Sequence, residues 1–275
     1  MFLCGKFKFD LAHPLVMGIV NVTPDSFSDG GYHSTANTAI EHALQLIADG
    51  ADILDIGGES TRPGAATVSE QEELDRVLPV LEGLRGVTVP ISIDTYKPAV
   101  MRAAILAGAS MVNDVNALQA DGALQVISQS DVAVCLMHKQ GTPQTMQQGP
   151  AYRDVVEEVN AFLRDRVTAA EAAGITRKRI VIDPGFGFGK TVEHNLALLR
   201  GLGAFRELDV TLLVGLSRKS MLGAITGREV NDRMAASVAA ALLSVQRCAN
   251  IVRAHDVRET VDALKIWNAV NGSER

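Results

Sequence analysis

Short apolar runs alternate with longer amphipathic segments along the whole chain. The runs are rich in Val, Ile and Leu and show little of the period-two alternation that marks a strand with one exposed face. Strands that are buried on both faces, as in parallel sheets, have this composition. The pattern therefore predicts eight parallel strands, over Leu15–Val20, Ala51–Ile56, Val89–Ile93, Ser110–Val112, Val132–Met137, Ile180–Ile182, Thr211–Val214 and Ala249–Val252.

The segments between these runs carry the periodicity and the end signals of helices. Ser69-Glu70-Gln71-Glu72 has the spacing of a capping box, and Gly86 lies near the expected end of the same helix. The clearest helical segments are Thr38–Ala48, Ser69–Leu84, Tyr152–Ala173 and Val257–Val270. Eight strand–helix units in a chain of this length predict an α/β fold, the (β/α)8 TIM barrel. A doubly wound open sheet is the alternative, because the pattern does not show whether the sheet closes.

Composition favours a single folded unit. No Ser/Gly linker, low-complexity tract or charge block interrupts the alternation, so we expect one domain over residues 1–275, with its core from about residue 15 to residue 270. With 275 residues, of which 47% are hydrophobic, the chain can bury a large core. The net charge of −6 leaves no basic stripe for a phosphate backbone, which argues against nucleic-acid binding.

Cysteine usage and hydropathy predict a cytoplasmic protein. The three cysteines are far apart and include no C-x-x-C pair, which argues against a disulfide framework or a zinc site and for a reducing compartment. No apolar run approaches the ~20 residues of a membrane span. The N-terminal segment also lacks the apolar centre of a signal peptide.

Polar residues follow the apolar runs directly. In chain order they are Asn21; Glu59, Thr61 and Arg62; Asp94; Asn113 and Asp114; His138; Asp183; Lys219; and Arg253 and His255. In a parallel barrel, the carboxyl ends of all strands share one rim, where active sites form. Taken singly, Asp94, Asp183 and Asn113-Asp114 could be helix caps or turn residues. Their shared position predicts one functional site.

The turn after Ile180–Ile182 is the most distinctive segment, and it reads Asp183-Pro184-Gly185-Phe186-Gly187-Phe188-Gly189-Lys190. A buried strand here would deliver Asp183 to a pocket with bare backbone beside it. Gly189-Lys190-Thr191 resembles the end of a P-loop. The first glycine of that motif would fall on Pro184, so we do not expect a nucleotide-phosphate cradle.

The rim residues divide into two chemical groups. Two carboxylates and an amide would suit the N–H donors of a flat polar heterocycle, and they come from Asp94, Asp183 and Asn113. A guanidinium, an imidazole and an amide oxygen would suit a phosphate or pyrophosphate that carries hydrated Mg²⁺, and they come from Arg253, His255 and Asn21. Lys219 can bridge the two groups.

Eight motifs, taken in order, carry a resemblance to a known family. They are residues 21–31, residues 58–64, Ile93-Asp94-Thr95, Asn113-Asp114, Met137-His138, residues 183–190, Ser217-Arg218-Lys219-Ser220 and Arg253-Ala254-His255-Asp256. Together they resemble the dihydropteroate synthases of the bacterial folate pathway, from about residue 15 to residue 270. The (β/α)8 barrel is the fold of that family, in agreement with the alternation of runs and helices.

The resemblance implies a transferase that condenses 6-hydroxymethyl-7,8-dihydropterin pyrophosphate with 4-aminobenzoate to give 7,8-dihydropteroate and pyrophosphate. The residues implied for the pterin pyrophosphate are Thr61, Asp94, Asn113, Asp183, Lys219, Arg253 and His255. Those implied for 4-aminobenzoate are Phe27, Thr61, Arg62, Pro63, Phe188, Lys219 and Ser220.

The resemblance also implies a mechanism and partners. Catalysis would rest on Arg253, His255, Asn21 and Lys219, with Asn21 as the protein ligand of the cofactor Mg²⁺ on the departing pyrophosphate. The amine of 4-aminobenzoate would then attack, so no side-chain nucleophile is expected. A homodimer through late helices such as Arg233–Val245 is implied as well. Sulfonamide inhibition is expected, because the Phe188 and Ser220 positions are intact.

Two other functions remain open at this point. A pterin-dependent methyltransferase on the same barrel would keep Asp94, Asn113 and Asp183 but would have no use for Thr61-Arg62-Pro63. A non-catalytic pterin-binding barrel should have lost Arg253, His255 or Asn21, and all of these are present.

Overall fold

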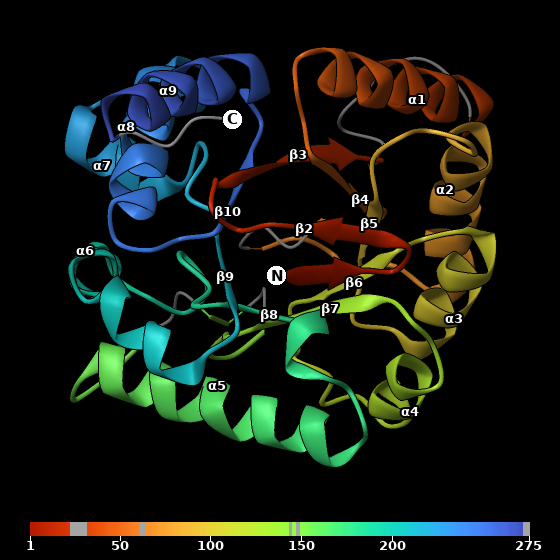
Figure 1. Ribbon diagram of the computed structural model, residues 1–275, viewed down its shortest axis with the longest axis horizontal. Helices are drawn as coiled ribbons and strands as arrows, with labels where there is room; N and C mark the ends of the chain where they lie inside the picture. The colour runs from red at the N-terminus through yellow and green to blue at the C-terminus, as the bar shows by residue number, and fades with distance from the viewer. Residues whose placement is uncertain (23–31, 61–63, 143–144, 147–148, 272–275) are drawn as a thin grey trace.

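The computed structural model describes residues 1–22, 32–60, 64–142, 145–146 and 149–271. Eight parallel strands form a closed barrel in the order β10-β3-β4-β5-β6-β7-β8-β9, and helices surround it (Figure 1). The predicted (β/α)8 barrel is therefore confirmed, and the open-sheet alternative is wrong.

The barrel strands coincide with the predicted apolar runs. They are β3 (Leu15–Asn21), β4 (Ile53–Gly57), β5 (Ile91–Asp94), β6 (Met111–Asp114), β7 (Ala133–Met137), β8 (Ile180–Asp183), β9 (Thr211–Val214) and β10 (Ile251–Ala254). Several strands extend past the run into the polar residue that follows it. Asp94, for example, pairs in register with Asn113. The strand ladder thus continues to the rim and fixes where these side chains start.

Helices cover the outside of the barrel (Figure 1). They are α1 (Tyr32–Ala48), α2 (Glu70–Gly83), α3 (Pro98–Ala107), α4 (Ala123–Ser128), α5 (Val155–Ala172), α6 (Val192–Arg200), α7 (Ser220–Thr226), α8 (Met234–Val245) and α9 (Val257–Val270), with short 3-10 helices η2 (Arg177–Arg179), η3 (Leu202–Leu208) and η4 (Val230–Asp232). Ser69 caps α2 as predicted, because its hydroxyl accepts from the Glu72 amide at 3.2 Å. Among the described residues, no helix combines the length and the hydropathy that crossing a membrane requires.

An antiparallel hairpin of β1 (Phe2–Cys4) and β2 (Phe7–Phe9) precedes the barrel, and the prediction missed it. The rings of Phe2 and Phe9 stack with centroids 6.0 Å apart. Phe2 and Cys4 are fully buried, in one cluster with the first inward residues of the strands, such as Leu15 and Ile53. The hairpin therefore closes the amino-terminal end of the barrel, and its three-residue strands are too short to show a period.

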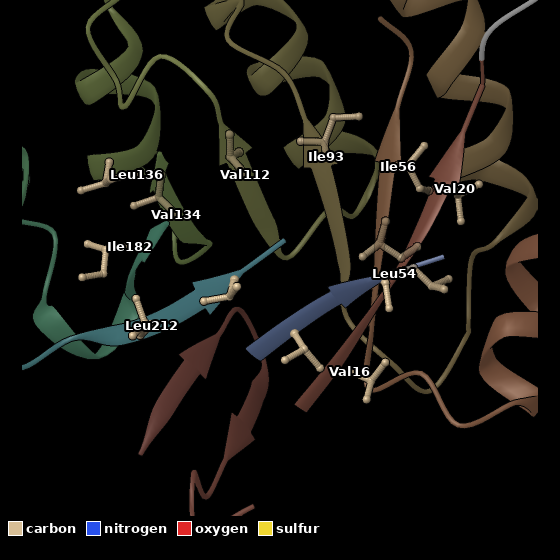
Figure 2. Close-up of a cluster of buried hydrophobic side chains, with 14 of the residues drawn as sticks. Val16, Val20, Leu54, Ile56, Ile93, Val112, Val134, Leu136, Ile182 and Leu212 are labelled. Atoms are coloured by element: carbon tan, nitrogen blue, oxygen red, sulfur yellow. The ribbon is translucent and has the colours of Figure 1, made fainter. Parts of the chain in front are cut away.

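The main core lies between the barrel and its helices. Figure 2 shows alternate strand residues that belong to this layer, among them Val16, Val20, Leu54, Ile56 and Val112. The residues between them face the barrel interior. Both faces of each strand are thus buried, which explains the continuous apolar runs. Toward the carboxyl ends, the inward positions change from apolar to polar.

Candidate active site

The carboxyl end of the barrel interior holds an arginine between two carboxylates. The Nε of Arg253, on β10, lies 2.6 Å from Oδ2 of Asp55, on β4. Its Nη2 lies 3.0 Å from Oδ2 of Asp94, on β5. The Asn113 amide donates to the same Asp55 oxygen at 3.0 Å. The structure therefore joins Arg253, which the sequence analysis grouped with the phosphate residues, directly to the predicted heterocycle group.

Sequence reasoning missed Asp55. It lies inside Ile53-Leu54-Asp55-Ile56, which was interpreted only as an apolar strand. The residue is fully buried, and its position opposite Ser92 faces the barrel interior. A carboxylate in the middle of an otherwise apolar strand was the signal, because a buried charge needs a partner or a function.

Several buried acceptors at this end lack a protein donor. Within the described part of the chain, the Oδ1 atoms of Asp55, Asp94 and Asn113 have no hydrogen-bond partner. Buried polar atoms are nearly always paired, so such a group indicates a missing partner. Three acceptors on residues that hydrogen bonds link around Arg253 match a ligand with several N–H donors.

Burial shapes the charges of this pocket. It raises the pKa of the Asp94 carboxyl, and the Asp55 charge adds to the rise while Arg253 opposes it. Burial likewise raises the pKa of Asp183, and the Gly185 amide that donates to this carboxyl opposes the rise. Burial alone would lower the pKa of Arg253, but Asp55 and Asp94 reverse the direction, so the guanidinium stays charged.

The turn after β8 forms one side of the pocket. Oδ1 of Asp183 accepts from the Gly185 amide at 2.7 Å. Lys219, at the start of α7, donates to the Phe186 carbonyl at 2.7 Å, and its Nζ lies 4.1 Å from the centre of the Phe188 ring. Burial lowers the pKa of Lys219 to about 8. The structure thus brings Lys219 and Phe188 together as the sequence predicted, while Ser220 is exposed at the first residue of α7.

His255 directly follows β10, and Asn21 ends the neighbouring strand β3. Nδ1 of His255 lies 3.0 Å from the Ser217 hydroxyl, which also accepts from the His255 amide at 3.1 Å. Ser217 therefore holds His255 through both the backbone amide and the imidazole ring. The sequence pattern predicted no role for Ser217, whose contact with His255 depends on the fold. Asn21 is half-buried at the end of β3.

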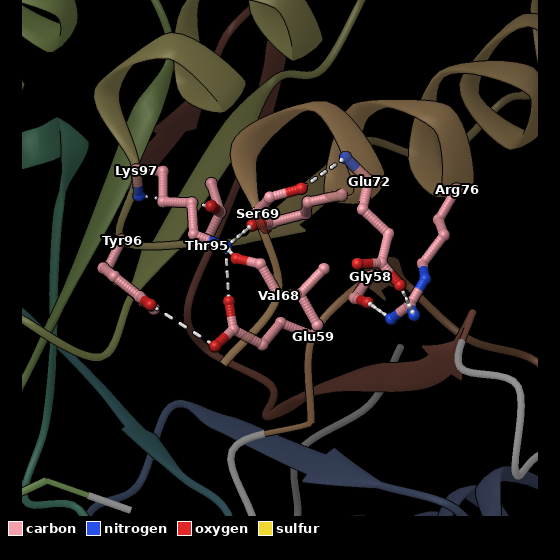
Figure 3. Close-up of polar contacts among 10 residues, drawn as sticks. Gly58, Glu59, Val68, Ser69, Glu72, Arg76, Thr95, Tyr96 and Lys97 are labelled. Carbon is pink, nitrogen blue, oxygen red and sulfur yellow. Dashed lines mark hydrogen bonds and ion pairs between the residues drawn. The ribbon is translucent and has the colours of Figure 1, made fainter. Parts of the chain in front are cut away.

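Glu59 does not join the barrel pocket. Figure 3 shows it in a network at the base of the loop between β4 and α2. Lys97 Nζ lies 2.5 Å from Glu59, 2.6 Å from Glu73 and 2.6 Å from the Val68 carbonyl, and Arg76 donates to the Gly58 carbonyl at 2.7 Å. The network therefore ties together the two described ends of this loop.

Other predicted residues divide between structural roles and residues outside the described ranges. Asp114 is a turn residue, because its carboxylate accepts from the Asn116 and Leu118 amides, each at 2.7 Å. The residues outside the described ranges are Phe27, Thr61, Arg62 and Pro63. Their assignments stay predictions.

Comparison with known proteins supports a shared family. The family model described as "Pterin binding enzyme" matches residues 17–255. Dihydropteroate synthase of Neisseria meningitidis serogroup B is 53% identical over 274 residues, which cover 97% of this chain and 96% of that protein.

Solved structures agree with this relationship. Dihydropteroate synthase of Xanthomonas albilineans with 4-aminobenzoic acid superposes with a TM-score of 0.90 at 55% identity, over 95% of this chain and 94% of that one. The same enzyme with 7,8-dihydropteroate has a TM-score of 0.88 at 52% identity, over 96% and 95% of the two chains. The Yersinia pestis enzyme in a sulfonamide drug complex has a TM-score of 0.94 at 47% identity, over 99% and 100%. This chain therefore belongs to the dihydropteroate synthase family of pterin binding enzymes.

Proposed function

We propose that this chain condenses 6-hydroxymethyl-7,8-dihydropterin pyrophosphate with 4-aminobenzoate to give 7,8-dihydropteroate and pyrophosphate. The observation that carries the proposal is the set of buried, unpaired acceptors on Asp55, Asp94 and Asn113 beside the Arg253 guanidinium. The relatives support it, because one that spans nearly the whole chain is named for this activity and another binds its product.

The pterin would lie in the carboxyl-end pocket. A dihydropterin is flat and carries N–H donors along one edge, so Asp94, Asn113 and Asp183 would accept from it. Lys219 would donate to the acceptors of the ring, and Arg253 would pack on its face. Oδ1 of Asp55 would accept from the ring as well, while its Oδ2 orients both Arg253 and Asn113.

The pyrophosphate would lie toward Arg253, His255 and Asn21. Mg²⁺ keeps much of its water and is commonly held by one or two protein oxygens together with substrate phosphates. The described residues contain no cluster of three His, Cys, Asp or Glu side chains that could hold a metal alone. A single amide oxygen, that of Asn21, therefore fits an ion carried by the substrate, which would neutralise charge on the leaving group.

The reaction breaks the C–O bond between the pterin methylene carbon and the pyrophosphate, whose oxygen takes the electron pair. The guanidinium of Arg253 and the imidazole of His255 would stabilise the charge that develops there. The amine of 4-aminobenzoate gives its lone pair to the same carbon and then loses a proton. Because the second substrate is the nucleophile, the chain needs no Ser, Cys or other nucleophilic residue.

The 4-aminobenzoate site would lie beside the β8–α6 turn. Phe188 and Lys219, which are in contact, would form part of this site together with Ser220, the first residue of α7. The other assigned residues lie outside the described ranges. A sulfonamide should compete with 4-aminobenzoate, and inhibition that is not competitive with this substrate would contradict the proposed pocket.

We also propose a cytoplasmic homodimer that uses α8. Leu243 exposes 40% of its surface on this helix, which is apolar area that a second copy could cover. The free thiols of Cys4, Cys135 and Cys248 suit a reducing compartment. Light scattering that gives the mass of one chain would contradict the dimer.

A pyrophosphate-release assay tests the function directly. The purified protein is given both substrates with Mg²⁺ present, and then with the metal chelated. We expect release that requires both substrates and falls when Mg²⁺ is removed. A methyltransferase or a silent pterin-binding protein would release no pyrophosphate under either condition, and that result would overturn the proposal.

A further inference from the structure

The turn between β8 and α6 encloses a lysine that has no role in the site described above. Lys190 is only 3% exposed. Its Nζ donates to the Gly185 carbonyl at 2.9 Å and to the Phe188 carbonyl at 3.1 Å, and it lies 2.9 Å from Nδ1 of His138. The chain therefore folds back around its own ammonium group.

The three contacts match the three hydrogens of the ammonium form of Lys190. Burial and the Lys190 charge together lower the pKa of His138 to about 3, so the imidazole is neutral and Nδ1 can accept. Burial also lowers the pKa of Lys190, to about 7, while the Asp183 charge opposes the shift. An ammonium in this position is costly unless its three hydrogens are all bound.

The turn has no space to rearrange on this side. A side chain at Gly185 would begin 1.8 Å from the His138 carbonyl oxygen, and one at Gly189 would begin 2.5 Å from the Gln140 carbonyl oxygen. Tyr152, just before α5, donates to the Gly189 carbonyl at 2.9 Å. The back of the turn therefore packs directly on the segment that follows β7.

The front of the same turn faces the proposed 4-aminobenzoate site. Lys219 donates to the Phe186 carbonyl and lies over the Phe188 ring. Two lysines thus bind different carbonyls of one turn. Lys190 donates to those of Gly185 and Phe188, and Lys219 donates to that of Phe186. The Phe188 amide donates to the Gly185 carbonyl at 3.1 Å, so Lys190 binds the carbonyls at both ends of this short turn and holds the Phe188 backbone through them.

We propose that Lys190 is a positioning residue for 4-aminobenzoate binding, which acts by fixing the Phe188 backbone and thereby its ring beside Lys219. This inference rests on the proposed function. Lys190 touches neither substrate in this proposal, so its effect passes through Phe188.

The effect should fall mainly on 4-aminobenzoate. Asp183, the pterin residue nearest this turn, has supports that do not involve Lys190. Its carbonyl accepts from the His138 amide at 2.9 Å, and its carboxylate accepts from the Gly185 amide. Loss of the ammonium should therefore release Phe188 more than it disturbs Asp183.

The test replaces the lysine with a residue of similar length and no donor. For Lys190→Met, we expect the KM for 4-aminobenzoate to rise about tenfold, as for the loss of charged hydrogen bonds, and the KM for the pterin pyrophosphate to change by less than about twofold. Lys178→Met, at an exposed lysine of η2, is the matched control and should leave both values unchanged. Equal changes for both substrates, or no change, would overturn the inference.

A double-mutant cycle tests the route through Phe188. In a Phe188→Ala background, Lys190→Met should raise the KM for 4-aminobenzoate by less than about twofold, because the ring that it positions is gone. Additive effects would overturn the inference. If Lys190→Met does not fold, Lys190→Gln, which keeps a shorter donor, should give a smaller rise confined to the same substrate. Pyrophosphate release by the unaltered chain tests the proposed function separately, so the two failures are distinguishable.

Discussion

The two ends of the barrel interior come from the same strands but have opposite chemistry. Apolar residues at the amino end are followed, two positions farther along the same strand and on the same face, by polar residues at the carboxyl end. The pairs are Ile53 and Asp55, Met111 and Asn113, Val181 and Asp183, and Ile251 and Arg253. A step of about 7 Å along each strand thus separates a closed apolar layer from a charged pocket.

The difference separates stability from function. At the amino end, the hairpin residue Phe2 completes a layer of mostly apolar side chains, and burial of such a layer favours folding. At the carboxyl end, Asp55 and Asp94 are held with only one guanidinium between them and retain unpaired oxygens. Such groups cost stability in the absence of a ligand. We infer that burial of the apolar layer offsets the stability that the charged pocket costs. Substitutions in the apolar layer should therefore change stability, and substitutions in the pocket should change ligand binding.

The largest effect should follow the loss of the shared cation. Arg253→Met leaves two buried carboxylates without their counter-charge and removes the guanidinium from the leaving group. We expect kcat/KM for pyrophosphate release to fall at least about a thousandfold. Arg258→Met, at an exposed arginine of α9, is the control and should retain activity. A loss of less than about tenfold in Arg253→Met would contradict the central place of this residue.

This pocket also shows how far sequence reasoning reaches. Asp94 and Asn113 were predictable, because each ends an apolar run and the ends of parallel strands meet. The contact of Arg253 with Asp55 was not, because it joins residues 198 positions apart. This contact forms only because the barrel closes and because the arginine side chain is long. Neither property can be recognised from the residues next to Arg253 or Asp55 in the sequence.

The amino end was less predictable than the barrel strands. The strands were readable because both faces are buried, so each forms a continuous apolar run. The hairpin of Phe2–Cys4 and Phe7–Phe9 has only three residues in each strand, and Lys8 interrupts the second. Its burial comes from residues such as Met111 and Val181, which lie far away in the sequence.

Ile53→Ala should weaken the packing of the apolar layer without changing the charged pocket. The side chain is fully buried, so its truncation should lower the free energy of unfolding by about 3 kcal/mol. Both KM values should stay within about twofold of the original, since no proposed ligand contact changes. Denaturant unfolding and steady-state kinetics measure the two effects. Asp55→Asn, two residues along β4, is the matched partner and should mainly raise the KM for the pterin. A similar loss of pterin affinity in Ile53→Ala would show that the layers are not separable.

Asp183→Asn should separate the pterin site from the 4-aminobenzoate site within the charged pocket. An amide can no longer accept from two N–H donors at both of its terminal atoms, so pterin affinity should fall by roughly a hundredfold. Affinity for 4-aminobenzoate, measured with the pterin site saturated, should change much less. Isothermal titration with each ligand measures both values. An unchanged pterin affinity would refute the role of Asp183.

Acidity should also distinguish the two ends. At the amino end, burial raises the pKa of the Cys4 thiol, so it stays neutral around pH 7. At the carboxyl end, burial lowers the pKa of His138 to about 3. An imidazole in the unfolded chain has a pKa of about 6.5, so between these values the unfolded state binds one more proton. The free energy of unfolding should therefore fall as the pH falls from about 6.5 toward 3.

Other groups titrate in the same pH range, so a variant is needed to isolate the contribution of His138. Burial raises the pKa of Asp114 to about 6. The contribution of this carboxyl to the free energy of unfolding should therefore increase as the pH falls from about 6 to about 4. His138→Asn keeps an acceptor that can face Lys190 but does not ionise. From about pH 7 to about pH 5, the original chain should lose about 2 kcal/mol more unfolding free energy than this variant. Parallel curves for the two proteins would mean that His138 ionises as freely in the folded barrel as in the unfolded chain, which its burial beside an ammonium should prevent.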